Sequence, residues 1–156
     1  MNDVINVIYG TLSGNSEDCA KNLCEKLNKN GFQTDLNSIS EIDATFLQKC
    51  KYVFLCISTY GDGEPPDDAW DQWDAMVESQ DNDFKNFNYS VLALGDTDYE
   101  LFCEAGKRFD EAFHNQGANR VISRVDCNVE FEKPAEEWSN TVLKYLQGAQ
   151  KKLSIV

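Results

Sequence analysis

The middle of the chain contains an apolar run, YVFLCI at Tyr52–Ile57, in which polar residues do not alternate with apolar ones. A strand of this kind is buried on both faces, which is typical of the centre of a parallel sheet covered by helices. Shorter apolar runs predict further strands at Val4–Tyr9, Phe32–Leu36, Ser90–Leu94 and Val121–Val125. The chain therefore supplies five candidate strands for one sheet.

Segments with helical spacing or helix-boundary residues separate these strands. They lie at Asn15–Asn30, Ile42–Cys50, Ala69–Val77, Cys103–Gln116 and from Pro134 to about Leu146. Gly31 and Gly117 stand where glycines commonly follow a helix. The alternation predicts an α/β fold, a three-layer α/β/α sandwich with a five-stranded parallel sheet of order 2-1-3-4-5.

A length of 156 residues suits one domain, so we expect a single domain over 1–156 with a partly mobile tail at Gln147–Val156. No apolar run approaches the ~20 residues that span a bilayer. The start of the chain has no basic leader and is predicted to be a strand from Val4 onward. We therefore expect a cytoplasmic protein with no membrane partner.

Acidic residues outnumber basic residues by 27 to 14, which gives a net charge of −13. Phosphate backbones are bound by Lys and Arg, so this balance argues against nucleic acid as a partner, and we expect none. A protein partner with a basic surface fits the charge, because the field would speed the encounter of the two proteins. The alternative is that the acidic surface serves solubility alone.

Cysteine and histidine provide no catalytic or metal chemistry. The six cysteines include no C-x-x-C pair, so neither a zinc site nor a thioredoxin-type redox pair is predicted. Cys56 lies within an apolar strand and should be a small buried hydrophobe. His114, the one histidine, lies in a polar helical stretch and is predicted to be a surface residue.

Ligands of such sheets bind beyond the carboxyl ends of the strands, near the switch between strands one and three. The first loop at that edge, GTLSGNSED at Gly10–Asp18, is rich in hydroxyls and amides and precedes a helix, whose N-terminus suits a phosphate. It lacks the G-K-[ST] and G-x-G-x-x-G patterns, so neither a nucleoside triphosphate nor a dinucleotide fits. A phosphate monoester remains, beside the simpler interpretation that Ser13, Asn15 or Ser16 only caps the helix.

Two further loops each bring one tyrosine to the same edge. Tyr60 lies in STYGDGEPPDDAW (Ser58–Trp70), and Tyr99 lies in LGDTDYELFC (Leu94–Cys103). Two aromatic rings beside a phosphate site predict a planar ring held between them. The alternative is that each tyrosine packs on its own loop.

Together, the motifs T-L-S-G-N-S, S-T-Y-G-D-G-E-P-P and L-G-D-T-D-Y-E-L-F-C resemble the flavodoxin family. The resemblance is strongest to the FMN domain of diflavin reductases, especially that of the sulfite reductase flavoprotein. It extends through AGKRFDEAF (Ala105–Phe113), RVDCNVEFE (Arg124–Glu132) and EEW (Glu136–Trp138), and covers about Val4 to Leu146. It implies a flavodoxin-like fold with FMN as the cofactor.

The resemblance also implies which residues bind the cofactor. The first loop would hold the FMN phosphate, and the other two would hold the isoalloxazine between Tyr60 and Tyr99. The implied cofactor-binding residues are Thr11, Leu12, Ser13, Gly14, Asn15, Ser16, Ser58, Thr59, Tyr60, Gly61, Leu94, Gly95, Asp96, Thr97, Asp98, Tyr99, Glu100, Leu101, Phe102 and Cys103. The carbonyl near Gly61 is a candidate to meet flavin N5–H, and Asp126 a candidate to approach the flavin.

Two positions depart from the reductase pattern. Leu101 stands where the reductases tend to carry histidine, and Leu12 stands where glutamine is usual. Each removes one polar side chain, and backbone N–H groups should still supply much of the binding. No second cofactor domain is visible in the sequence, and strand five leaves no room for the ~20-residue insertion of long-chain flavodoxins. We therefore expect a free-standing short-chain flavodoxin.

Carboxylates crowd the same sheet edge. They are Asp62, Glu64, Asp67, Asp68, Asp71, Asp74, Asp96, Asp98 and Glu100. They should disfavour an anionic reduced flavin and lower the potential of the second electron. They should also orient a basic partner toward the exposed edge of the ring.

The predicted function is one-electron transfer by FMN, with no catalytic side chain. An NAD(P)H-dependent flavoprotein reductase would be the donor, a haem, iron–sulfur or radical enzyme the acceptor, and the protein a monomer. The alternatives are an FMN domain excised from a diflavin reductase and an FMN-dependent quinone or flavin reductase. A receiver-type signalling module is disfavoured, because its acidic positions hold Gly10-Thr11 and Ser58-Thr59 here.

Overall fold

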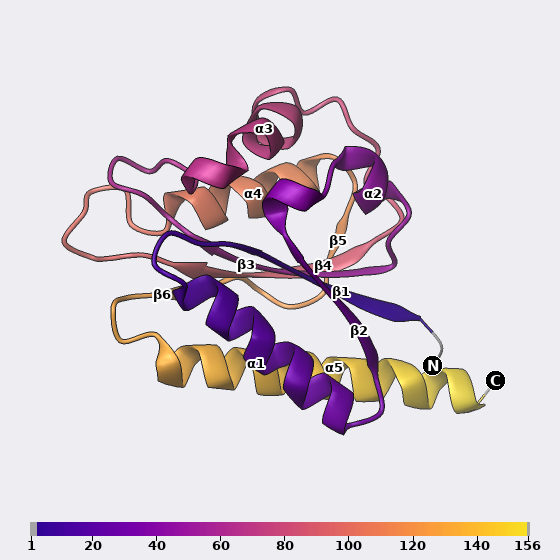
Figure 1. The fold of residues 1–156 in the computed structure, drawn as a ribbon. Coiled ribbons are helices and arrows are strands. Elements are labelled where there is room, and N and C mark those ends of the chain that lie inside the picture. The colour runs from indigo at the N-terminus through magenta and orange to yellow at the C-terminus, as the bar shows by residue number, and fades with distance from the viewer. Residues whose placement is uncertain (1–2, 156) are drawn as a thin grey trace.

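The computed structural model describes residues 3–155 and confirms the three-layer sandwich (Figure 1). The strands are β1 (Val4–Gly10), β2 (Gln33–Ser38), β3 (Tyr52–Ser58), β4 (Asn88–Leu94), β5 (Asn119–Arg120) and β6 (Val125–Cys127). All strand pairs are parallel, the order is β2-β1-β3-β4-β5, and β6 also pairs with β4. Every residue of β3 is buried, as the unbroken apolar run predicts.

Helices cover both faces of the sheet (Figure 1). One face packs against α1 (Asn15–Lys29) and α5 (Glu132–Ile155), and its core includes Leu23 and Trp138. The other face packs against α2 (Ala44–Gln48), α3 (Trp70–Gln72) and α4 (Glu104–Asn115), and its core includes Trp73 and Phe109. The short helical turns η1 (Ile39–Glu41), η2 (Asp67–Ala69) and η3 (Trp73–Glu78) belong to this second layer.

Two helices are each followed by a glycine with a positive φ angle. Gly31 adopts φ +86° after α1, and the N–H of Phe32 donates to the Leu27 carbonyl at 3.0 Å. Gly117 adopts φ +107° after α4. Both positive φ angles favour glycine, so each helix ends where the sequence predicts.

The predicted fifth strand is wrong in its extent. Instead of one strand at Val121–Val125, the structure has β5 and β6, and residues 121–124 lie between them. Val121 and Ile122 pack against the core on the α5 side, whereas Arg120 and Arg124 reach Asp110 of α4 on the opposite face. Contacts on both sides of the sheet therefore divide the strand.

Two helix predictions also need correction. The helix predicted at Ala69–Val77 is divided into η2, α3 and η3, of which η3 is a π-helix. α5 continues to Ile155 instead of ending near Leu146, so the described part of the tail expected to be mobile is helical. Val156, at the end of that tail, lies outside the described residues.

The predictions that Cys56 is buried and that His114 lies on the surface are confirmed. All six cysteines are free and buried, and Cys56 is fully inaccessible. His114 is exposed on α4. Within residues 3–155, no group of histidine, cysteine and acidic side chains is arranged to hold a metal ion.

Candidate functional site

Three loops follow β1, β3 and β4 at the carboxyl edge of the sheet and surround two adjoining cavities. The inner cavity, of about 210 Å³, is lined by Leu12, Ser13, Asn15, Ser58, Thr59, Leu94, Gly95, Asp96, Asn128, Val129 and Phe131. The outer cavity, of about 450 Å³, is lined by Leu12, Thr59, Tyr60, Gly61, Asp62, Glu64 and Tyr99. Leu12 and Thr59 line both, so the cavities are neighbours at the predicted sheet edge.

The first loop leaves the N-terminus of α1 without a side-chain cap. Gly14 takes the N-cap position with φ +93°, and no side chain within the described residues caps the helix. The hydroxyl of Thr11 instead accepts from the N–H of Gly14 at 2.9 Å. The expectation that Ser13, Asn15 or Ser16 caps the helix is therefore wrong, because a left-handed glycine occupies that position. The first-turn N–H groups remain available to an anion.

Ser16 does not point its hydroxyl toward an open cradle. It is fully buried, and its Oγ lies 2.6 Å from Oγ of Ser58 in the second loop. Each hydroxyl can donate one proton and accept two, so the pair still has one proton to donate elsewhere. The contact joins the first loop to the second and fixes their spacing.

The second loop is a tight turn that presents Tyr60. The N–H of Tyr60 donates to the Glu64 carbonyl at 2.8 Å, and the N–H of Glu64 donates back to the Tyr60 carbonyl at 3.0 Å. Gly61 and Gly63 turn the chain with φ +36° and +87°. Half of the Tyr60 side chain stays exposed beside the outer cavity, at 52%.

The third loop presents Tyr99, which is 54% exposed at the outer cavity. Its base is closely packed, because a Cβ at Gly95 would lie 2.9 Å from the backbone N of Cys103. Cys103 is buried at the N-cap of α4 with φ +55°. Burial raises the pKa of its thiol to about 12, so Cys103 is a packing residue there and not a thiolate nucleophile.

The segment after β6 forms a fourth wall that the sequence prediction missed. Asn128, Val129 and Phe131 line the inner cavity. Asn128 Oδ1 accepts from the N–H of Thr97 at 3.0 Å, and its Nδ2 donates to Thr97 Oγ1 at 2.9 Å. The sheet topology could have predicted this wall, because the loop after the fifth parallel strand must reach the same edge as the other three loops.

Eleven of the twenty predicted cofactor-binding residues line the two cavities. They are Leu12, Ser13, Asn15, Ser58, Thr59, Tyr60, Gly61, Leu94, Gly95, Asp96 and Tyr99. The other nine lie in the same loops without lining a cavity: Thr11, Gly14, Ser16, Thr97, Asp98, Glu100, Leu101, Phe102 and Cys103. Asp126 is in an ion pair with Arg124, whose Nε lies 2.8 Å from Asp126 Oδ1, and does not line either cavity.

The site combines an uncharged anion-binding loop after β1 with an aromatic slot, the part of the outer cavity lined by Tyr60 and Tyr99. Among the described residues, no lysine or arginine lines either cavity, so hydroxyl, amide and backbone N–H groups must bind any anion. None of the nine predicted carboxylates is in an ion pair within residues 3–155. Leu12, Tyr60 and Tyr99 supply exposed apolar surface for a planar ring.

Residues 7–138 match the sequence profile of the flavodoxin family. The chain belongs to the flavodoxin family. Its cofactor is FMN, which has both a phosphate monoester and a planar ring and therefore fits the uncapped helix and the aromatic slot. It is an FMN-binding domain of the flavodoxin type.

Sequence relatives of this flavodoxin are much longer proteins. It is 37% identical over 145 residues to the sulfite reductase [NADPH] flavoprotein alpha-component of Bacillus subtilis, which covers 93% of this chain and 24% of that protein. The corresponding protein of Shewanella sp. strain ANA-3 is 37% identical over 139 residues, which cover 89% and 23%. The chain thus spans about a quarter of these relatives.

Solved flavodoxins match the fold over their full length. The flavodoxin of Streptococcus pneumonia TIGR4 superposes with a TM-score of 0.82 at 26% identity, covering 94% of this chain and 99% of that one. Flavodoxin 2 of Bacillus cereus superposes with a TM-score of 0.77 at 29% identity, with the same coverage. In the described part of this flavodoxin, no helix is long and apolar enough to span a bilayer.

Proposed function

We propose that this flavodoxin carries single electrons from an NAD(P)H-dependent flavoprotein reductase to a haem, iron–sulfur or radical enzyme. The observation that carries the proposal is the pair of half-exposed tyrosines, Tyr60 and Tyr99, at one cavity rimmed by unpaired carboxylates. When bound, FMN accepts and donates electrons one at a time, and the protein controls potential and access.

The chain's own residues would bind and orient the cofactor. The first-turn N–H groups of α1 and the loop hydroxyls would hold the phosphate, since no cationic side chain lines the site. Tyr60 and Tyr99 would cover the faces of the ring, and Leu12 would contact it beside them. All twenty loop residues predicted from the sequence belong to this proposed site.

The rim would select the partner. Asp62 and Glu64 are exposed at the outer cavity, and Asp67, Asp68 and Asp71 continue the acidic surface. A basic partner would be steered toward this edge, and its encounter rate would fall as salt screens the charges. The half-exposed Leu101 and Val129 add an apolar contact at the same edge.

The second candidate function is that of the FMN domain of a diflavin reductase. The 37% identity to sulfite reductase flavoproteins supports it, because those proteins are about four times as long as the matched segment. In that case the electron donor would be a neighbouring domain instead of a separate protein. A quinone or flavin reductase is less well supported, since two flanking tyrosines would leave little room for a second substrate over the ring.

The test is an anaerobic titration of the FMN-loaded protein, followed by mixing with NADPH alone and with NADPH plus a separate flavoprotein reductase. We expect reduction only when the reductase is present, and a rate that falls with ionic strength. Failure of the protein to bind FMN would overturn the proposal at its first step. Rapid NADPH oxidation by the protein alone would overturn the carrier assignment.

A further inference from the structure

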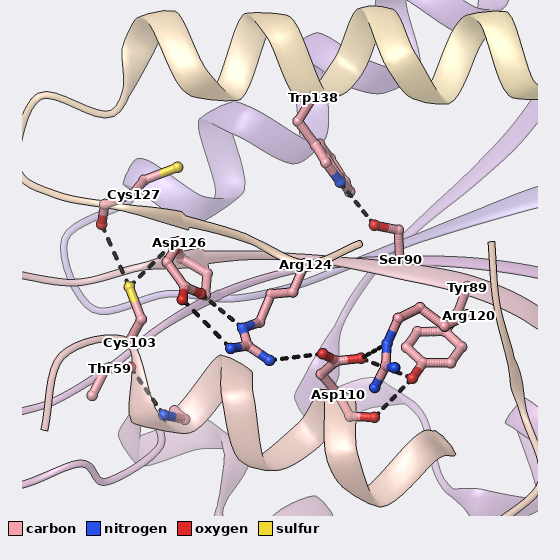
Figure 2. A network of polar contacts seen from close by, with 12 residues as sticks. Thr59, Tyr89, Ser90, Cys103, Asp110, Arg120, Arg124, Asp126, Cys127 and Trp138 are labelled. Carbon is pink, nitrogen blue, oxygen red and sulfur yellow. Dashed lines mark hydrogen bonds and ion pairs between the residues drawn. The ribbon is translucent and has the colours of Figure 1, made fainter. Parts of the chain in front are cut away.

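The divided fifth strand creates a gap beside β4. β5 pairs with Asn88 and Tyr89, and β6 pairs with Leu92, Ala93 and Leu94. Ser90 lies opposite the gap, and its hydroxyl accepts from Trp138 Nε1 of α5 at 3.0 Å (Figure 2). The pairing of the fifth strand with β4 is therefore interrupted between β5 and β6.

Side chains on both sides of this interruption are instead bound to one carboxylate of α4. The side chain of Asp110 is 4% exposed and accepts from Arg120 Nε at 2.8 Å and from Arg124 Nη1 at 2.7 Å. The Tyr89 hydroxyl donates to the same residue at 2.8 Å. Figure 2 shows Asp110 between the two arginines, one from each side of the gap.

The two arginines differ in the strand segment to which each is attached. Arg120 ends β5, which lies toward the amino end of β4. Arg124 immediately precedes β6, and its Nε also donates to Asp126 Oδ1 at 2.8 Å (Figure 2). Only Arg124 is therefore linked directly to the part of the strand that reaches the cofactor edge.

β6 holds the third loop by several bonds. The Cys127 carbonyl accepts from the N–H of Gly95 at 2.9 Å. It also accepts from the thiol of Cys103 at 3.5 Å (Figure 2). Asn128 then makes its two hydrogen bonds to Thr97. These bonds fix both ends of the loop that carries Tyr99.

We propose that Arg124, anchored on Asp110, is a positioning residue that holds β6 and thereby sets the geometry of the loop at Leu94–Cys103 for FMN. The inference rests on the proposed role of that loop in binding the cofactor. Arg124 lines neither cavity and pairs with Asp110 and Asp126, so it acts through β6. Arg120 binds the same carboxylate of Asp110 but does not hold β6.

The two arginines give a matched pair of variants, Arg124→Met and Arg120→Met. Each removes one cation from the same buried carboxylate and leaves the other in place, so both should lower the urea midpoint of the protein. We expect Arg124→Met to raise the FMN dissociation constant about tenfold, because the loop is no longer preorganised. Arg120→Met should stay within about threefold of wild type.

Hydrogen exchange supplies a readout that general destabilisation would not reproduce. In the FMN-free protein, Arg124→Met should speed exchange of the Gly95 and Thr97 amides relative to Arg120→Met, since these amides donate to β6 and Asn128. Asp126→Asn, which weakens one partner of Arg124 at a half-exposed position, is the milder variant should Arg124→Met fail to fold. It should raise the dissociation constant in the same direction.

The outcomes separate the inference from the proposed function. Wild-type protein that does not bind FMN would sink the proposed function. Wild-type binding together with equal dissociation constants and equal exchange rates in the Arg124 and Arg120 variants would overturn the positioning role. An unchanged dissociation constant in Asp126→Asn, with Arg124→Met unfolded, would overturn it as well.

Discussion

The hydroxyl of Thr59 accepts a hydrogen bond from the backbone N–H of Ala105 at 3.1 Å (Figure 2). Thr59 follows β3, whereas Ala105 lies in the first turn of α4, which follows the third loop. α4 has Cys103 at its N-cap and no side-chain cap from its own segment. The second loop therefore caps the helix that begins where the third loop ends.

Replacing Thr59 by Val should test this contact. The variant keeps the shape of the side chain and removes the acceptor, so the free energy of unfolding should fall by about 1 kcal/mol, as for a lost helix cap. Urea denaturation of the FMN-free protein measures the loss. Thr59→Ser retains the hydroxyl and is the control, so an equal loss in both variants would contradict a capping role.

Removing either flanking ring should weaken FMN binding. Tyr99→Ala and Tyr60→Ala should each cost about 1–3 kcal/mol of binding free energy, by comparison with stacking of bases on aromatic side chains. Quenching of FMN fluorescence measures the dissociation constant. Tyr99→Phe keeps the ring and should bind nearly as wild type. Tyr145→Ala, on α5 beside Tyr52 at the amino end of β3, should leave binding unchanged. Full affinity in both alanine variants would exclude the aromatic slot.

Two glycines should respond oppositely to alanine. At Gly95 a Cβ would lie 2.9 Å from backbone N and 3.0 Å from Sγ of Cys103, so Gly95→Ala must displace the third loop. We expect a stability loss of about 1–3 kcal/mol together with weaker FMN binding. At Gly148 of α5 the added Cβ would meet open space, and Gly148→Ala should raise stability by up to about 1 kcal/mol. Thermal denaturation compares the two, and a stable, FMN-binding Gly95→Ala would refute the close approach.

Neutralising the acidic rim should make the flavin easier to reduce. Asp62→Asn and Glu64→Gln remove negative charge beside the outer cavity, so the potential of the second electron should rise by roughly 10–40 mV per charge. Spectroelectrochemical titration measures this shift, which should shrink as salt is added. The control variant is Glu137→Gln, which removes an exposed charge on α5. Asp43→Asn is unsuitable as a control, because Asp43 caps α2. Potentials that do not move would show that the rim has no electrostatic effect on the flavin.

The buried thiols predict loss of stability in alkali. Burial raises the pKa of Cys19 and Cys103 to about 12, and of Cys50 and Cys127 to about 11, from an ordinary value of 9.0. The unfolded chain therefore releases these protons at lower pH than the folded chain does. The contribution of these thiols to stability is fully present below pH 9 and should be lost as the pH rises from 9 toward 11–12. Urea midpoints across this range measure the slope, which Cys50→Ala should make shallower; a flat profile would contradict the raised pKa values.

Patterns that depend on local chemistry predicted much of this protein. The unbroken apolar run at β3 identified a strand buried on both faces, and the alternation of strands and helices led to the observed strand order. Glycines marked the ends of α1 and α4. These features follow from burial and backbone conformation, which a single segment of sequence expresses directly.

Features that depend on distant partners were not predictable in the same way. The two halves of the divided fifth strand both pair with Asp110, which lies ten residues before Arg120 and fourteen before Arg124 in the sequence. The hydroxyl of Ser16 is engaged by Ser58, forty-two residues away, so its sequence position could not reveal that it is buried. The role of Asn128 in the site likewise depends on where Thr97 lies in space.

The divided fifth strand also affects how the sheet meets other chains. One edge of the sheet consists of β5 and β6, of two and three residues, and the other is β2, a polar strand with the sequence QTDLNS. Long, flat apolar edge strands template the addition of strands from neighbouring molecules, whereas short or polar edges do not. This protein can therefore expose an apolar surface at its loops while both edges of its sheet discourage aggregation through strand pairing.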